Sequence, residues 1–214
     1  AVALVGLFLF SAILDEFFAS KDKYLIDIAA IFTFASGIWS IRDQPKRRFA
    51  GTVLGGVILF SGLLQLVVEF PALELLHLVC WLCFLLLTTW VAVELAFFSR
   101  QVDTNAIVGS ICIYLLMGFI WAMLYLLLLI HDPAAFNGLD TLSQSALHQD
   151  YFPDLLYFSF VSLTTMGFGE ITPASPLARF LTTIQGIAGQ FYIAILVASL
   201  VSARLTPQDA RPKE

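Results

Sequence analysis

Residues 164–170 have the residue types and spacing that could carry out chemistry. They read Thr-Thr-Met-Gly-Phe-Gly-Glu, so Gly167 and Gly169 alternate with larger residues. Glycine adopts positive φ without strain, and alternating backbone conformations can then turn successive carbonyl oxygens toward one axis. Four copies would stack rings of oxygens that replace the hydration shell of a cation, with the Thr165 hydroxyl as the innermost ring. The segment therefore predicts a filter for a dehydrated cation.

A short helix is predicted directly before this segment. Pro153 suits the first residue of the helix, where a missing N–H costs nothing, and Asp154 suits the positive end of the helix dipole. The helix would run to about Thr164, which gives ~12 residues and a length of roughly 18 Å. Because this is too short to span a bilayer, the helix is expected to enter the membrane and turn back. Its negative C-terminal end would then favour a cation in an inner cavity.

Six apolar segments surround this helix, and each has close to the ~20 residues that a membrane helix needs. They cover roughly residues 1–18, 24–41, 49–68, 72–98, 105–130 and 177–203. The chain is 59% hydrophobic and 13% charged, so much of its surface is expected to face lipid. Its net charge of -5 argues against a nucleic-acid partner. The predicted fold class is an all-α integral membrane protein with six transmembrane helices and a re-entrant pore helix between the fifth and the sixth.

The chain is expected to divide into three parts. These are a four-helix transmembrane bundle over 1–104, a two-helix pore module over 105–204 with a pore loop over 131–176, and a tail over 205–214. Lys and Arg gather on one side of the six spans, which predicts that this side and both termini are cytoplasmic. The outer loop carries carboxylates without Lys or Arg, and this charge would attract cations to the entrance.

The segment from Tyr157 to Pro173 resembles the pore loop of the potassium channel superfamily, whose signature is Thr-Val-Gly-Tyr-Gly-Asp, and is most similar to its bacterial and two-pore-domain types. The resemblance implies a passive potassium channel of the plasma membrane. It would be a homotetramer, formed with three further copies of the chain in a lipid bilayer. It would not be an enzyme and would need no cofactor beyond the permeant K+. The residues implied are the filter ligands for K+ (Thr165, Met166, Gly167 and Phe168), the filter mouth (Gly169 and Glu170) and the pore-helix support (Tyr157, Phe158 and Thr164).

Three positions of the filter depart from this signature. Met166 stands in place of valine, Phe168 in place of tyrosine and Glu170 in place of aspartate. The first two lie where the backbone would coordinate the ion, so selectivity should survive. Phe168 lacks a hydroxyl that could tie the filter to the surrounding helices. We therefore expect a looser filter, with altered selectivity or inactivation.

The last span carries candidates for a hinge and a gate. Gly189, and less well Gly186, could let the inner helix bend, or both could allow close helix packing. Ile193, Val197 and Val201 recur every four residues. They could form a hydrophobic constriction at the inner gate, or pack against the fifth span.

The fourth span lacks the charges of a voltage sensor, because residues 72–98 contain no Lys or Arg. The bundle is then structural or senses something else, and Asp27, His77 and Glu94 are the candidates for sensing. Cys80 and Cys83 have a C-x-x-C spacing, but no further Cys or His completes a site, so we interpret them as packing residues. The alternatives to a potassium channel are a weakly selective monovalent cation channel, a subunit of a potassium uptake transporter, and a non-conducting scaffold or modulatory subunit.

Overall fold

A computed structural model of the chain describes residues 45–65, 71–97, 104–139 and 151–205. The elements in chain order are α3 (Pro45–Gln65), α4 (Pro71–Phe97), α5 (Thr104–His131), β1 (Phe136–Asn137), α6 (Phe152–Leu163), β2 (Thr172–Pro173) and α7 (Pro176–Leu205). The expected spans over 1–18 and 24–41 lie outside the described residues.

Three of the described helices are long and apolar enough to cross a membrane. Their apolar stretches are Ala72–Glu94, Gly109–His131 and Pro176–Ser199, and they correspond to the last three spans predicted from the sequence. The apolar stretch of α3 covers Thr52–Gly62 and is shorter. The multi-pass membrane character of the chain is therefore supported by three helices, and the count of six remains a prediction.

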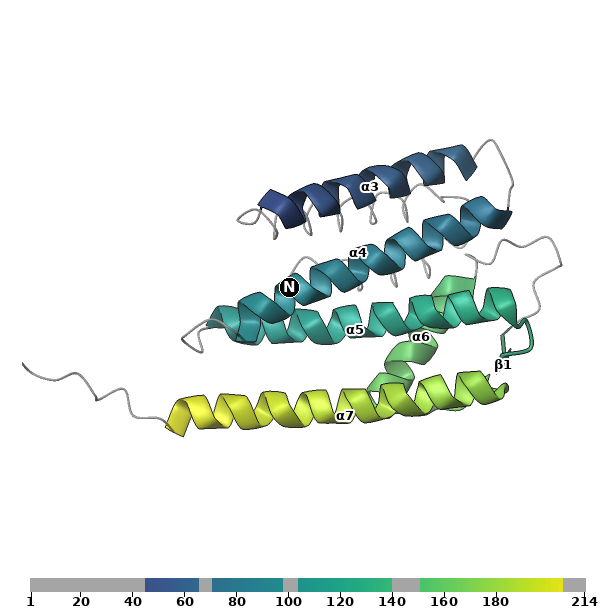
Figure 1. The fold of residues 1–214 in the computed structure, drawn as a ribbon. Helices are drawn as coiled ribbons and strands as arrows, with labels where there is room; N and C mark the ends of the chain where they lie inside the picture. Colours follow the sequence, from purple (N-terminus) through teal and green to yellow (C-terminus); the bar gives the residue numbers. More distant parts are fainter. Residues whose placement is uncertain (1–44, 66–70, 98–103, 140–150, 206–214) are drawn as a thin grey trace, which may run out of the picture.

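The long helices run in alternating directions (Figure 1). The α3, α4 and α5 helices follow one another side by side, and α7 lies beyond α5. The short α6 crosses obliquely between α5 and α7 and contacts both. The end of α5 and the start of α7 meet at β1 and β2, so the connection through α6 begins and ends at the same end of the molecule.

The β1–β2 pair closes the loop that leaves α5. The α5 helix ends at His131, just before Pro133, which lacks an N–H and cannot continue a helix favourably. The Asp132 carboxylate then accepts a hydrogen bond from the Ala134 N–H at 3.2 Å. Phe136 pairs with Pro173 and Asn137 with Thr172 in an antiparallel register. The regular secondary structure of the described residues is thus helical apart from this short pair, which the all-α prediction did not include.

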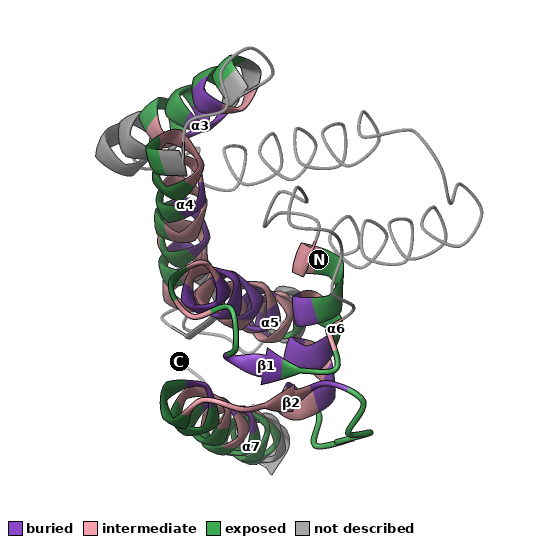
Figure 2. Cartoon of the chain, turned by 90° about the vertical axis from the view of Figure 1, so that its right-hand side faces the viewer, coloured by how far each residue is buried: buried purple, intermediate pink, exposed green. Residues whose placement is uncertain are grey.

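The core gathers around α5. Figure 2 shows buried positions concentrated on α5 and α6, whereas α7 is exposed over most of its length. Within the apolar stretch of α5 half of the residues are buried (50%), against 11% in α7. Burying a large apolar side chain such as Leu126 or Phe84 contributes roughly 1.5–3 kcal/mol. The exposed apolar face of α7 therefore has no partner within the single described chain.

Candidate functional site

The α6 helix begins at Phe152, one residue before the predicted first residue Pro153. Tyr151 is the N-cap residue, Pro153 falls in the first turn and Asp154 provides the acidic group there. The helix covers 12 residues and ends at Leu163, with Thr164 as its C-cap. The predicted end at about Thr164 is therefore correct to within one residue.

The end of α6 is a Schellman motif built from the first residues of the candidate filter. The Met166 N–H donates to the Val161 carbonyl at 3.0 Å, and the Thr165 N–H donates to the Ser162 carbonyl at 3.2 Å. Thr165 has a φ of 60°, and this left-handed position is usually held by glycine. A β-branched residue there is uncommon and points to a constrained, functional backbone. The sequence predicts positive φ at the glycines alone, so the left-handed conformation of Thr165 was not expected.

The backbone of the filter segment alternates in conformation. Positive φ occurs at every second residue, with 60° at Thr165, 61° at Gly167 and 95° at Gly169. Met166 and Phe168 between them do not have positive φ. Both glycines thus have the conformation that the alternation requires. All residues from 164 to 170 are exposed, including the large side chains of Met166 (63%) and Phe168 (64%). In a single chain, the backbone of residues 164–170 is consequently exposed.

The candidate filter mouth, Gly169 and Glu170, is in contact with the loop after α5. Gly138 has a φ of 84°, and a Cβ on this residue would lie 1.8 Å from the carbonyl oxygen of Glu170. Ala135 accepts backbone hydrogen bonds from Ala174 at 2.8 Å and from Ser175 at 3.2 Å. Only glycine fits at position 138 in this arrangement. Sequence reasoning missed this contact, because a single glycine in a polar loop carries no signal about what it approaches.

Tyr157 and Phe158 support the site in different ways. The Tyr157 hydroxyl donates a hydrogen bond to the Glu170 carboxylate, and this bond lowers the pKa of Glu170. Phe158 is buried and packs against Tyr125 and Phe136, with ring centroids 5.3 Å and 5.4 Å away. Tyr157 is thus tied to the mouth, while Phe158 joins the packing between α5, α6 and β1.

Thr164, the third candidate support residue, is exposed and binds back to its own helix. Its hydroxyl donates to the Phe160 carbonyl at 2.7 Å, and its N–H donates to the same oxygen at 2.9 Å. Thr164 therefore helps to satisfy the last carbonyls of α6, which would otherwise have no partner in the helix.

The candidate hinge residues of α7 lie in different surroundings. A Cβ on Gly189 would lie 2.9 Å from both the carbonyl oxygen and a methyl carbon of Leu163, whereas a Cβ on Gly186 would have no atom within 4 Å. The α7 helix continues through both residues. Gly189 thus permits close packing against the end of α6, and a hinge at either glycine stays a prediction.

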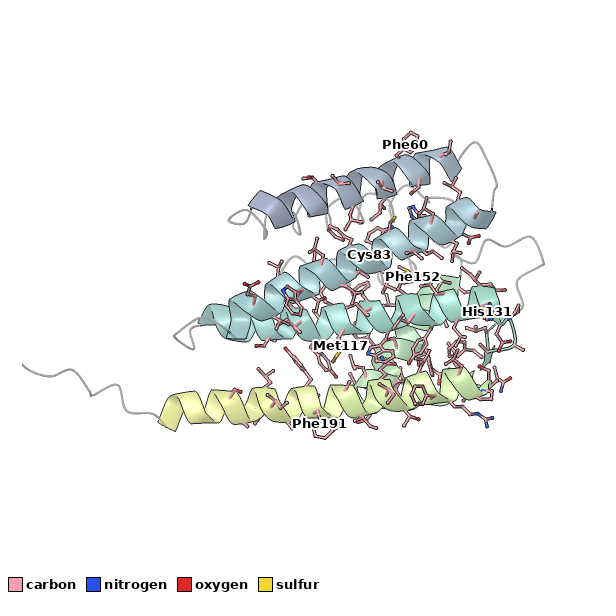
Figure 3. All side chains as sticks on the ribbon, in the orientation of Figure 1. Phe60, Cys83, Met117, His131, Phe152 and Phe191 are labelled. Carbon is pink, nitrogen blue, oxygen red and sulfur yellow. The ribbon has the colours of Figure 1, made fainter. Side chains whose placement is uncertain are left out.

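The candidate gate residues are only partly described. Ile193 (39%) and Val197 (53%) are exposed, so these two do not pack against α5 within one chain. The side chain of Val201 lies outside the described residues. Phe191, which is also exposed, points away from the other described helices (Figure 3).

Two tyrosines join the end of α6 to α5 and α7. The Tyr114 hydroxyl on α5 donates to the Leu163 carbonyl at 3.1 Å. Its ring stacks on Tyr192 of α7 with centroids 5.8 Å apart, and the Tyr192 hydroxyl donates to the Ser110 carbonyl at 2.6 Å. Sequence reasoning did not single out these tyrosines, because nothing in their spacing relates them to the filter.

The described part of the chain contains no group of three or more His, Cys, Asp or Glu side chains that could hold a metal ion. Cys80 and Cys83 are free thiols on α4, and Cys83 is exposed on that helix (Figure 3).

Residues 109–204 match the family model described as "Ion channel". Over 94 residues, 44% of this chain, the sequence is 34% identical to "Two pore potassium channel c" of Oryza sativa subsp. japonica. Over 59 residues, 28% of this chain, it is 38% identical to "Inward rectifier potassium channel Kirbac3.1" of Paramagnetospirillum magnetotacticum. The matched part spans 20% of the length of each of these relatives. No solved structure matches the chain significantly.

The family match covers α6, the alternating backbone and α7, which are the elements that build the candidate site. The family consists of ion channels, which are not enzymes. Residues 109–204, which contain the candidate site, are therefore similar in sequence to ion channels, and the two relatives that the chain matches are named as potassium channels.

Proposed function

We propose that the chain forms a passive, potassium-selective channel in the plasma membrane. The carbonyl oxygens of Thr165, Met166, Gly167 and Phe168 would bind K+, and Gly169 and Glu170 would form the mouth. The observation that carries this proposal is the alternation of positive φ at residues 165, 167 and 169 in a wholly exposed segment. Such an alternation aims successive carbonyls to one side, and rings of carbonyls replace the hydration shell of K+.

The proposed pore requires four copies, because one chain supplies a single strip of carbonyls. The exposed apolar face of α7 supports this assembly. Its members recur every three or four residues, as expected for one side of a helix: Leu177, Phe180, Ile184, Ile187, Phe191 and Ile195. We propose that three further copies and lipid cover this face. The α6 helix would then enter the membrane without crossing it, with its C-terminal end toward the ion path.

The charges near the filter suit a cation. The Glu170 carboxylate is held at the mouth by Tyr157, and its lowered pKa keeps it ionised at neutral pH. The C-terminal end of α6 carries a partial negative charge, which favours a cation in the cavity below the filter. Ile193, Val197 and Val201 would line the inner end of the pore as a hydrophobic gate, a role consistent with the exposure of the first two in a single chain.

The proposed orientation places both termini in the cytoplasm. The basic start of α3, which contains Lys46, Arg47 and Arg48, and the end of α7 lie at the end of the molecule remote from β1 and β2 (Figure 1). Positive residues favour the cytoplasmic side of a membrane protein. The mouth of the filter would therefore open to the outside.

A weakly selective monovalent cation channel is the second candidate. Phe168 is 64% exposed, and it has no hydroxyl with which to bind the helices behind the filter. A filter that widens at this position would discriminate less between K+ and Na+.

Ion flux through the purified full chain in liposomes separates these functions. We expect flux under a potassium gradient and little flux under an equal sodium gradient. Gly167→Ala should abolish it, because alanine is strained at a φ of 61°. Gly56→Ala is the matched control, since Gly56 lies on α3 with no atom within 4 Å of an added Cβ. Equal flux of the two ions would favour the weakly selective channel, and no flux together with no K+ binding by calorimetry would favour the scaffold.

A further inference from the structure

A buried polar side chain lies in the middle of α7, among apolar surroundings. Gln185 is fully buried, as are Ser159 on α6 and Tyr125 on α5. Among the described residues, Gln185 is the one buried amide side chain. Burying such a group is unfavourable unless each of its polar atoms finds a partner.

Gln185 joins three helices through its two polar atoms. Its Nε2 donates to the backbone carbonyl of Ser159 at 2.9 Å and to the Ser159 hydroxyl oxygen at 2.8 Å. Its Oε1 accepts a hydrogen bond from the Tyr125 hydroxyl. The Ser159 hydroxyl in turn donates to the carbonyl of Gly118 on α5 at 2.8 Å.

The direction of every hydrogen bond in this network is determined. The Ser159 carbonyl can only accept, so the amide nitrogen of Gln185 must face it and the amide oxygen must face Tyr125. The Ser159 hydroxyl accepts a hydrogen bond from Gln185, and it therefore donates its single proton to the Gly118 carbonyl. A shift of α6 along its axis would break several of these bonds at once and leave buried donors without acceptors.

Close packing beside the network prevents the same movement. A Cβ on Gly118 would lie 2.5 Å from two ring carbons of Phe160, so the Phe160 ring rests on the α5 backbone next to Ser159. Thr165 follows Ser159 by less than two turns of chain, and the Schellman motif joins the helix end directly to the filter. The axial position of α6 relative to α5 and α7 therefore determines the position of the proposed filter.

We propose that Gln185, Ser159 and Tyr125 are positioning residues that fix the axial position of α6 and, through it, the spacing of the filter carbonyls. This inference rests on the proposed potassium channel function. None of the three side chains contacts the ion path in this role. Their effect on selectivity passes through the backbone of α6.

The test compares the K+ over Na+ permeability ratio, from reversal potentials in planar bilayers, between the wild-type full chain and its variants. Gln185→Leu keeps the approximate volume and removes three hydrogen bonds, and we expect the ratio to fall by about tenfold or more. Gln185→Glu in its neutral form can still accept from Tyr125 and donate one bond to Ser159, so we expect partial rescue. Gly56→Ala on α3 is the control, because an added Cβ there has no atom within 4 Å, and it should keep the wild-type ratio.

Two smaller changes keep the inference testable if Gln185→Leu fails to fold. Ser159→Ala and Tyr125→Phe each remove one hydroxyl, and each should lower the ratio. Ser159→Ala combined with Tyr125→Phe should have less than the summed effect, because both act through the Gln185 amide. An unchanged ratio in these variants, or effects that simply add, would overturn the proposal.

The wild-type ratio by itself tests the proposed function. If the wild-type protein conducts K+ and Na+ equally, the potassium-selective function fails. The same combination of variants, measured on total cation conductance, then still decides the positioning role: coupled losses of conductance support it and additive losses refute it.

Discussion

Replacing Gly138 with alanine tests whether the loop after α5 holds the filter mouth in place. The added methyl group would lie 1.8 Å from the Glu170 carbonyl oxygen, although real Cβ atoms essentially never approach closer than 3.0 Å. The neighbouring atom is backbone and cannot rotate away. Either the loop or the mouth must therefore move, by at least about 1.2 Å.

The expected size of the effect has two parts. Alanine at a φ of 84° is strained by roughly 1–2 kcal/mol. Forcing extra volume into a packed contact typically adds about 1–3 kcal/mol. We therefore expect Gly138→Ala to lower the free energy of unfolding by at least about 2 kcal/mol. Because a displacement of this size is comparable to the tolerance of a coordination site, the K+ over Na+ permeability ratio should also fall.

The measurements are thermal unfolding in detergent and reversal potentials in planar bilayers. Gly56→Ala serves as the control for a glycine with open space around it. Gly138→Asn separates strain from collision, because asparagine tolerates positive φ but its Cβ still meets Glu170. If Gly138→Asn lowers stability and the permeability ratio as much as Gly138→Ala does, the collision with Glu170 is the cause. A Gly138→Ala protein with wild-type stability and wild-type permeability ratio would refute the reasoning.

Three further changes probe the surroundings of the filter. The Tyr157 bond favours ionised Glu170, so the stability it adds is complete above the ordinary carboxyl pKa of 4.5 and is lost as the pH falls through the lower folded-state value. Tyr157→Phe should therefore move the acid-induced loss of conductance to higher pH, and an unshifted pH profile would contradict this. Gly189→Ala should lower the free energy of unfolding by about 1–3 kcal/mol, because its Cβ would lie 2.9 Å from the Leu163 carbonyl oxygen. A change in channel opening without any loss of stability would instead indicate a hinge. Tyr114→Phe should lower the free energy of unfolding by about 1 kcal/mol by leaving the Leu163 carbonyl without its side-chain donor, and a thermal melt identical to that of the wild type would argue against that bond.

The sequence predicted the elements whose physical signals are local. Runs of ~20 apolar residues identify membrane helices with little ambiguity, and α4, α5 and α7 follow the predicted spans closely. Pro153 and Asp154 correctly indicated the start of α6. The spacing of Gly167 and Gly169 predicted the alternating backbone of the filter segment.

The contacts between distant segments could not be predicted in this way. Gly138 meets Glu170 across more than thirty residues of chain, and no pattern near either residue relates the two. The same applies to the β1–β2 pair, whose strands have two residues each. Gln185 did carry a weak signal, since an amide within an apolar span tends to hydrogen-bond to a neighbouring helix, but its partners on α5 and α6 depend on the tertiary structure.

The Schellman motif at the end of α6 also limits which changes of length the chain can accept. Thr165 both terminates the helix and begins the proposed filter, while Ser159 is hydrogen-bonded to Gln185 and Gly118. Inserting or deleting one residue between Ser159 and Thr165 would turn one of these ends by about 100° relative to the other. The helix would then have to give up either its anchor or its terminating motif. The number of residues between 159 and 165 is therefore constrained more strictly than their identity: substitutions can be tolerated there, and insertions or deletions cannot.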